Sequence, residues 1–186
     1  MRRFLELAAV FAFAFATLLF EVTTTKVFEF SLWANYAYLA ISTAMFGLGF
    51  SGVALTRWPG IARMPLVSFL PAMALAGGLT MLAAFATVNG VPIHLSELPE
   101  GWTWARELRN VAIVFLALAS PFFCFGLAIS RIFDERAEAA NVYYFADLIG
   151  AGLGAVAVAL WIPVLEPEGL VAAAAAISAG AGALFL

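Results

Sequence analysis

Charged residues are scarce in this sequence of 186 residues, where 9 basic and 12 acidic side chains make up only 11% of the chain. A soluble domain carries about 25% charged and about 45–50% apolar residues. Here 65% of the residues are apolar and the mean hydropathy is +1.01. A 19.8 kDa globule has too little interior to hide that much apolar surface from water. The composition therefore excludes soluble and disordered proteins and indicates that lipid surrounds most of the chain.

Cysteine and histidine are nearly missing as well. Cys124 is the one cysteine and lies in an apolar run, so it has no disulfide partner and is expected to be a small helix-packing residue. The one histidine, His94, has no cysteine or carboxylate at a ligand spacing. A basic stripe, a P-loop, an HExxH motif and a Ser/His/Asp set are also absent from the sequence. We therefore expect no metal, no cofactor, no nucleic-acid partner and no catalysis by this chain alone.

Long apolar runs, in contrast, are frequent. About 20 apolar residues cross the hydrocarbon core of a membrane as a helix. The runs predict an all-α, polytopic membrane protein with six transmembrane helices in one bundle, forming a single domain over residues 1–186. The six runs cover residues 4–20 (or 4–30), 32–56, 65–88, 111–130, 142–163 and 169–186.

The connections between these runs are short, except for residues 89–110. Its end, residues 102–108, contains Trp102 and Trp104 and predicts a short interfacial helix with its indoles at the level of the headgroups. The last run stops at Leu186 without a basic anchor or polar tail. We therefore expect a truncated record of a longer protein, with a final helix held by its neighbours as the alternative.

The distribution of basic residues predicts the orientation, because cytoplasmic loops are enriched in lysine and arginine. With six spans, one side of the membrane carries Arg2, Arg3, Arg57, Arg63, Arg131 and Arg136. The other side carries Lys26, Arg106 and Arg109, together with seven glutamates. The asymmetry predicts that both termini are cytoplasmic, in a multi-pass protein of the bacterial inner membrane.

Three ionisable residues, Glu21, Lys26 and Asp147, lie within or at the margin of the apolar runs. A charge at membrane depth is costly, so each is a candidate for a functional or pairing role. Glu21 and Lys26 are either charges that reach the interface or a polar site inside the bundle. For Asp147 we weigh structural pairing, with Arg131, Arg136 or Thr56, against a role in proton transfer.

Glycines gather in two of the runs and are candidates for close helix–helix packing, which small residues allow in lipid. Gly150 and Gly154 are four residues apart, as small residues at such contacts often are. The second group superficially matches a nucleotide-binding glycine run, but it lies inside an apolar helix rather than after a strand. The candidates are Gly47, Gly49, Gly52, Gly150, Gly152 and Gly154.

Several of these segments resemble polytopic spermidine-synthase-like membrane proteins. The first has a glutamate followed by threonines and a basic residue, at 21–28, and the second is an Ile-Ser…Gly-Leu-Gly helix within 36–52. The third is Pro-Phe-Phe through the glycine at 121–126, followed by a Tyr-x-Ala-Asp-Leu-x-Gly-Ala-x-x-Gly helix within 141–154. The resemblance covers nearly the whole chain, although Lys26 stands where many relatives have arginine.

The resemblance implies a helical membrane domain that normally precedes a soluble, Rossmann-like aminopropyltransferase domain. No residue that binds its decarboxylated S-adenosylmethionine donor is carried over to this sequence. The membrane half of the family also resembles one six-helix half of major-facilitator transporters. Three functions are therefore weighed. The first is a non-catalytic membrane domain or accessory subunit that anchors or packs against a partner or a domain, in a larger membrane complex or a homo-oligomer. The second is a transporter-like half that moves a small solute, and the third is a fragment of a membrane aminopropyltransferase-like enzyme. Lipid is an expected partner in every case.

Overall fold

The computed structural model describes residues 2–31, 37–92 and 103–185, and its regular secondary structure there is helical, without a strand. This confirms the predicted all-α class. Five of the described helices are long and apolar enough to cross a membrane. These are α1 (Arg2–Ser31), α2 (Ala37–Arg57), α4 (Leu66–Gly90), α5 (Thr103–Glu135) and α6 (Ala140–Ala183). The short helix α3 (Pro59–Ala62) and a 3₁₀ turn (Ala137–Ala139) lie in connections.

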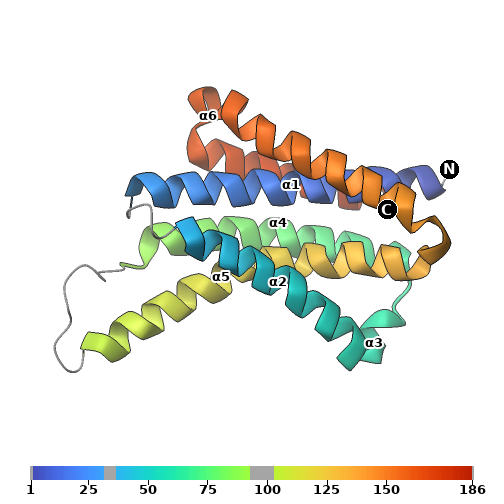
Figure 1. The fold of residues 1–186 in the computed structure, drawn as a ribbon, viewed down its shortest axis with the longest axis horizontal. Helices are drawn as coiled ribbons and strands as arrows, with labels where there is room; N and C mark the ends of the chain where they lie inside the picture. The colour runs from blue at the N-terminus through green and yellow to red at the C-terminus, as the bar shows by residue number, and fades with distance from the viewer. Residues whose placement is uncertain (1, 32–36, 93–102, 186) are drawn as a thin grey trace.

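The predicted count of six spans is not confirmed, because the last two predicted spans are the two arms of α6. Between these arms, Glu166 has φ 55° and ψ 169°, in the region that residues other than glycine rarely adopt. Pro167 follows, and a proline both lacks an amide hydrogen and disfavours a helical conformation in the residue before it. The chain turns back there, and the first arm (140–165) and second arm (167–183) run in opposite directions (Figure 1).

Successive long segments run in alternate directions, so the two termini lie at the same end of the bundle (Figure 1). We call this end the N-terminal end. Helix α2 ends there at Arg57, and α5 ends there just before Arg136. The arginines that the sequence assigns to one side of the membrane therefore gather at one end of the fold.

Helix α5 differs from its prediction. Residues 102–108 are expected to form a separate interfacial helix before a span at 111–130, but one continuous helix runs from Thr103 to Glu135. Trp104 therefore lies in the first turn of α5, where its side chain is exposed. Trp102, His94 and the first part of the predicted second span, 32–36, lie outside the described residues.

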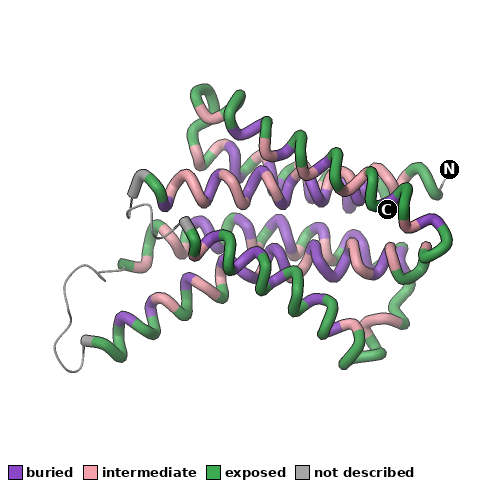
Figure 2. The backbone as a smooth tube through the Cα atoms, viewed as in Figure 1, coloured by how far each residue is buried: buried purple, intermediate pink, exposed green. Residues whose placement is uncertain are grey.

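The core is formed by α1, α4 and α5 with the inner faces of α2 and α6, as the distribution of buried residues shows (Figure 2). Large aromatic side chains join α1 to α5 at its centre. The rings of Phe13 and Phe125 lie 5.6 Å apart, and those of Phe20 and Phe122 lie 5.8 Å apart. All four side chains are fully buried. Such ring pairs add to the contact energy beyond the area that they bury.

Each outer segment packs mainly on one helix of this core. The first arm of α6 lies against α1, where Phe15 contacts Trp161 with ring centroids 6.0 Å apart. The second arm lies against α4, where the buried Ser178 hydroxyl donates a hydrogen bond of 2.6 Å to the Ala74 carbonyl oxygen. Helix α2 packs mainly on α5, through ring contacts such as that of Phe46 with Phe115. The two arms of α6 thus hold different helices of the core.

Candidate functional site

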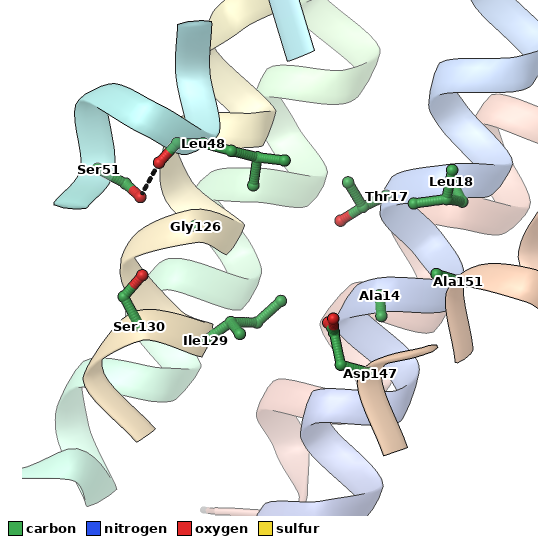
Figure 3. A pocket seen from close by; sticks show the side chains of 10 residues that line it. All are labelled: Ala14, Thr17, Leu18, Leu48, Ser51, Gly126, Ile129, Ser130, Asp147 and Ala151. Carbon is green, nitrogen blue, oxygen red and sulfur yellow. Dashed lines mark hydrogen bonds between the residues drawn. The ribbon is translucent and has the colours of Figure 1, made fainter. Parts of the chain in front are cut away.

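Four helices surround a cavity of about 200 Å³ (Figure 3). Asp147 lies seven residues after the first residue of α6, which places it about 10 Å along the helix axis from that end. The cavity therefore lies within the apolar length of the bundle. Its lining residues are Ala14, Thr17 and Leu18 of α1, Leu48 and Ser51 of α2, Gly126, Ile129 and Ser130 of α5, and Asp147 and Ala151 of α6.

The carboxylate of Asp147 points into this cavity (Figure 3). Within the described part of the chain, no hydrogen bond or ion pair joins it to another residue. Two of the hydroxyls that line the cavity are already donors: Thr17 donates to the Phe13 carbonyl oxygen at 2.6 Å, and Ser51 donates to the Leu48 carbonyl oxygen at 2.6 Å. Their oxygen lone pairs stay available as acceptors.

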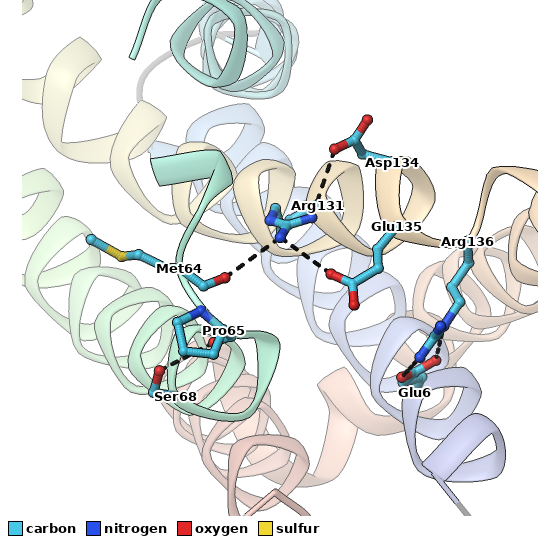
Figure 4. Close-up of polar contacts among 8 residues, drawn as sticks. All are labelled: Glu6, Met64, Pro65, Ser68, Arg131, Asp134, Glu135 and Arg136. Carbon is cyan, nitrogen blue, oxygen red and sulfur yellow. Dashed lines mark hydrogen bonds and ion pairs between the residues drawn. The ribbon is translucent and has the colours of Figure 1, made fainter. Parts of the chain in front are cut away.

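The structure does not show Asp147 paired with any of the three partners considered from the sequence, and each of these has contacts elsewhere. Arg131 forms ion pairs with Glu135 at 3.2 Å and with Asp134 at 3.7 Å (Figure 4). Arg136 binds Glu6, and the Thr56 hydroxyl donates to the Val53 carbonyl oxygen at 2.9 Å. Local partners one turn away on the same helix satisfy Arg131 and Thr56 more readily than a carboxylate on another helix.

A second polar cluster, which we call the Glu6 cluster, joins Glu6, Arg136 and Tyr143 at the N-terminal end. The Glu6 carboxylate accepts hydrogen bonds from Arg136 Nη2 at 2.7 Å, from Arg136 Nε at 2.9 Å and from the Tyr143 hydroxyl at 2.7 Å (Figure 4 shows the arginine contact). Glu6 and Tyr143 are buried, and the hydrogen bonds to Glu6 raise the pKa of the Arg136 guanidinium. The cluster fastens the start of α1 to the start of α6.

Sequence reasoning missed Glu6. It lies in the second turn of α1, three residues after Arg3, and a glutamate in that position is usually an exposed charge at the membrane surface. Its partner Arg136 is 130 residues away in the chain. The one available signal was that Glu6 lies inside the apolar run 4–20, on the same helix face as Val10 and Phe13, which are buried.

Glu21 and Lys26 do not reach the Asp147 cavity. Lys26 Nζ lies 2.7 Å from Glu29 Oε2, and the two side chains are 45% and 46% exposed. Such a pair contributes little to stability and fits the interpretation of Lys26 as a charge that reaches the interface. Glu21 is half-buried, and its main-chain carbonyl oxygen accepts hydrogen bonds from the Thr24 and Thr25 hydroxyls at 3.0 Å and 2.8 Å. The three candidate charges therefore do not form one site.

The six candidate glycines divide into two groups by what a side chain would meet. A Cβ at Gly150 or Gly154 would clash with the main chain of α1, at Phe11 and Phe15 respectively. A Cβ at Gly47 would lie 2.5 Å from the Ala119 carbonyl oxygen of α5. These three glycines allow backbones to approach closely. The others, Gly49, Gly52 and Gly152, have no atom of a described residue within 4 Å of an added Cβ.

Comparison with protein families, curated proteins and solved structures finds no match to this chain. The functional argument therefore rests on the geometry. Within residues 2–31, 37–92 and 103–185, no three His, Cys, Asp or Glu side chains are grouped so as to hold a metal ion. The features that need an explanation are the Asp147 cavity, the Glu6 cluster and the outward-facing glycines of α2.

Proposed function

We propose that this chain is a non-catalytic, multi-pass membrane domain that packs against a partner protein. The observation that carries the proposal is the outward position of Gly49 and Gly52 on α2, where an added Cβ would have no atom within 4 Å. Helices associate in lipid where small residues let their backbones approach closely. On the same helix, Gly47 serves such a contact with α5 inside the chain. The resemblance to the membrane half of spermidine-synthase-like proteins supports the same role.

Substitution of these glycines tests the proposal. We expect Gly49→Leu and Gly52→Leu to reduce the mass of the assembly extracted from its native membrane, measured by native mass spectrometry, because leucine would hold a docked helix away. The melting temperature of the isolated chain stays at its wild-type value, since both positions are open in the fold. Gly180→Leu, at another open position on α6, is the matched control. An assembly whose mass is unchanged by both α2 substitutions contradicts the proposal.

The proposed topology is six passes through the bacterial inner membrane, with both termini in the cytoplasm. It is supported by the common position of the termini (Figure 1) and by the arginines that the helix ends place there. In a Cys124→Ala background, we expect a cysteine at position 168, at the turn of α6, to react with a membrane-impermeant thiol reagent in intact cells. A cysteine at position 138, which is exposed at the N-terminal end, reacts only after the cells are opened. The reverse pattern contradicts this orientation.

A second candidate function is a transporter-like half-bundle that moves a small solute, and the Asp147 cavity favours it. The cavity lies between α1 and α6 on one side and α2 and α5 on the other, and its carboxylate has no partner in the described chain. Intramembrane ionisable residues frequently mark solute pathways. For a cationic solute, a transport role predicts that Asp147→Asn folds normally and abolishes cation flux into liposomes, measured with a potential-sensitive dye. A domain that only packs shows no flux in either form.

A further inference from the structure

We infer that the Asp147 cavity binds a sodium ion that keeps part of its water shell. This goes beyond the proposed packing role, which needs no ion, and it fails or holds independently of that role. The inference starts from charge. Asp147 is the one charged residue among those that line the cavity, and its carboxylate points into it (Figure 3). A carboxylate at this depth is costly unless a cation or hydrogen-bond donors accompany it.

The ligands available around Asp147 are oxygen atoms. The hydroxyls of Thr17 and Ser51 donate their hydrogens to carbonyl oxygens of their own helices and so present lone pairs. The Ser130 hydroxyl also lines the cavity and has no hydrogen bond to another described residue. Thr17 of α1 lies on the same side of the cavity as Asp147, whereas Ser51 of α2 and Ser130 of α5 lie on the opposite side (Figure 3). Carboxylate, hydroxyl and water oxygens are the ligands of hard cations.

The size and charge of the cavity select among such cations. A volume of about 200 Å³ holds several water molecules at about 30 Å³ each, and is far larger than a bare ion. A single carboxylate balances one positive charge. Tight protein sites for calcium use several carboxylate and carbonyl ligands, and the described residues hold no group of three acidic or other metal-binding side chains. A monovalent ion bridged by water to the hydroxyls is the occupant that fits.

The experiment compares thermal unfolding of the full chain in a neutral detergent with sodium chloride and with N-methylglucamine chloride at equal ionic strength. A ligand that binds only the folded state stabilises it by mass action. With sodium at about five times its dissociation constant, we expect a rise of about 2–4 °C in melting temperature for a protein of this length. Equal melting temperatures in the two salts overturn the inference.

Variants of the cavity separate a bound ion from a general salt effect. Asp147→Asn keeps the shape of the side chain and removes its charge, so the sodium-dependent rise is lost. Glu138→Gln, which removes an exposed acid near the same end of α6, keeps it. If Asp147→Asn does not fold, Ser130→Ala decides, because loss of one hydroxyl ligand shrinks the rise at the same sodium concentration. An undiminished rise in Asp147→Asn, or in Ser130→Ala where Asp147→Asn does not fold, overturns the inference.

Discussion

Replacing Gly150 with leucine is expected to destabilise the bundle by about 3 kcal/mol or more, which is a large share of a typical free energy of unfolding of about 5–15 kcal/mol. A Cβ at this position would clash with the main chain of α1 at Phe11. Backbone atoms within a helix cannot move to relieve the clash as the end of a flexible side chain can. Gly154, one turn further along, meets α1 in the same way at Phe15. The first arm of α6 would have to move away from α1 along its length. Thermal unfolding in detergent and the yield of monodisperse protein measure the loss.

Gly152→Leu is the matched control, because Gly152 lies on the same arm with no atom within 4 Å of an added Cβ. Both substitutions replace a helical glycine with a good helix former, which by itself favours the helix by about 0.5–1 kcal/mol. The difference between the two variants therefore measures the clash with α1. Leu148→Ala, at a half-exposed position, is expected to change stability much less than Gly150→Leu. Equal stability of Gly150→Leu and Gly152→Leu would show that α6 does not pack on α1 through this face.

The two groups of glycines show how far the sequence predicts packing. Gly150 and Gly154 are four residues apart and share one helix face, whereas Gly152 lies about 200° away from Gly150 around the helix. Helical spacing therefore separates Gly152 from the other two. It does not reveal which face meets another helix of the chain, since both faces are apolar. That choice depends on the position of α1, which is set by contacts between distant segments.

For the spans, the turn and the charged residues too, local features can be predicted from the sequence, whereas contacts between distant segments cannot. Apolar runs locate the membrane-spanning segments because the length of a span is set by the bilayer, whatever the tertiary fold. The turn at Glu166 can also be predicted from the sequence, because Pro163, Pro167 and two glutamates interrupt an apolar stretch there. The surroundings of Asp147 and the partners of Glu6 cannot be predicted from the sequence. They depend on which helices are neighbours, and no local pattern records that Glu6 faces Arg136.

The largest effect expected from a polar substitution is at Glu6. Glu6→Ala removes the acceptor of three hydrogen bonds and leaves the buried Tyr143 hydroxyl and the Arg136 guanidinium unpaired. Removing one partner of a buried ion pair costs about 3–5 kcal/mol. The Arg136 side chain is 35% exposed and can turn to water, so we expect about 2–3 kcal/mol. In a protein of this length that lowers the melting temperature by about 5–10 °C.

The design of this experiment depends on the geometry of the Glu6 cluster. Tyr143→Phe removes one hydrogen bond to Glu6 and is expected to cost about 1 kcal/mol, because the ring stays in place. In the Glu6→Ala background the same change costs less, since the hydroxyl no longer has its acceptor. The double-mutant cycle therefore gives a coupling energy that a mere change in net charge cannot produce. Glu138→Ala removes an exposed acid at the same end and serves as the charge control. If Glu6→Ala and Glu138→Ala have the same melting temperature and the cycle shows no coupling energy, the start of α1 is not fastened to α6 through the Glu6 carboxylate.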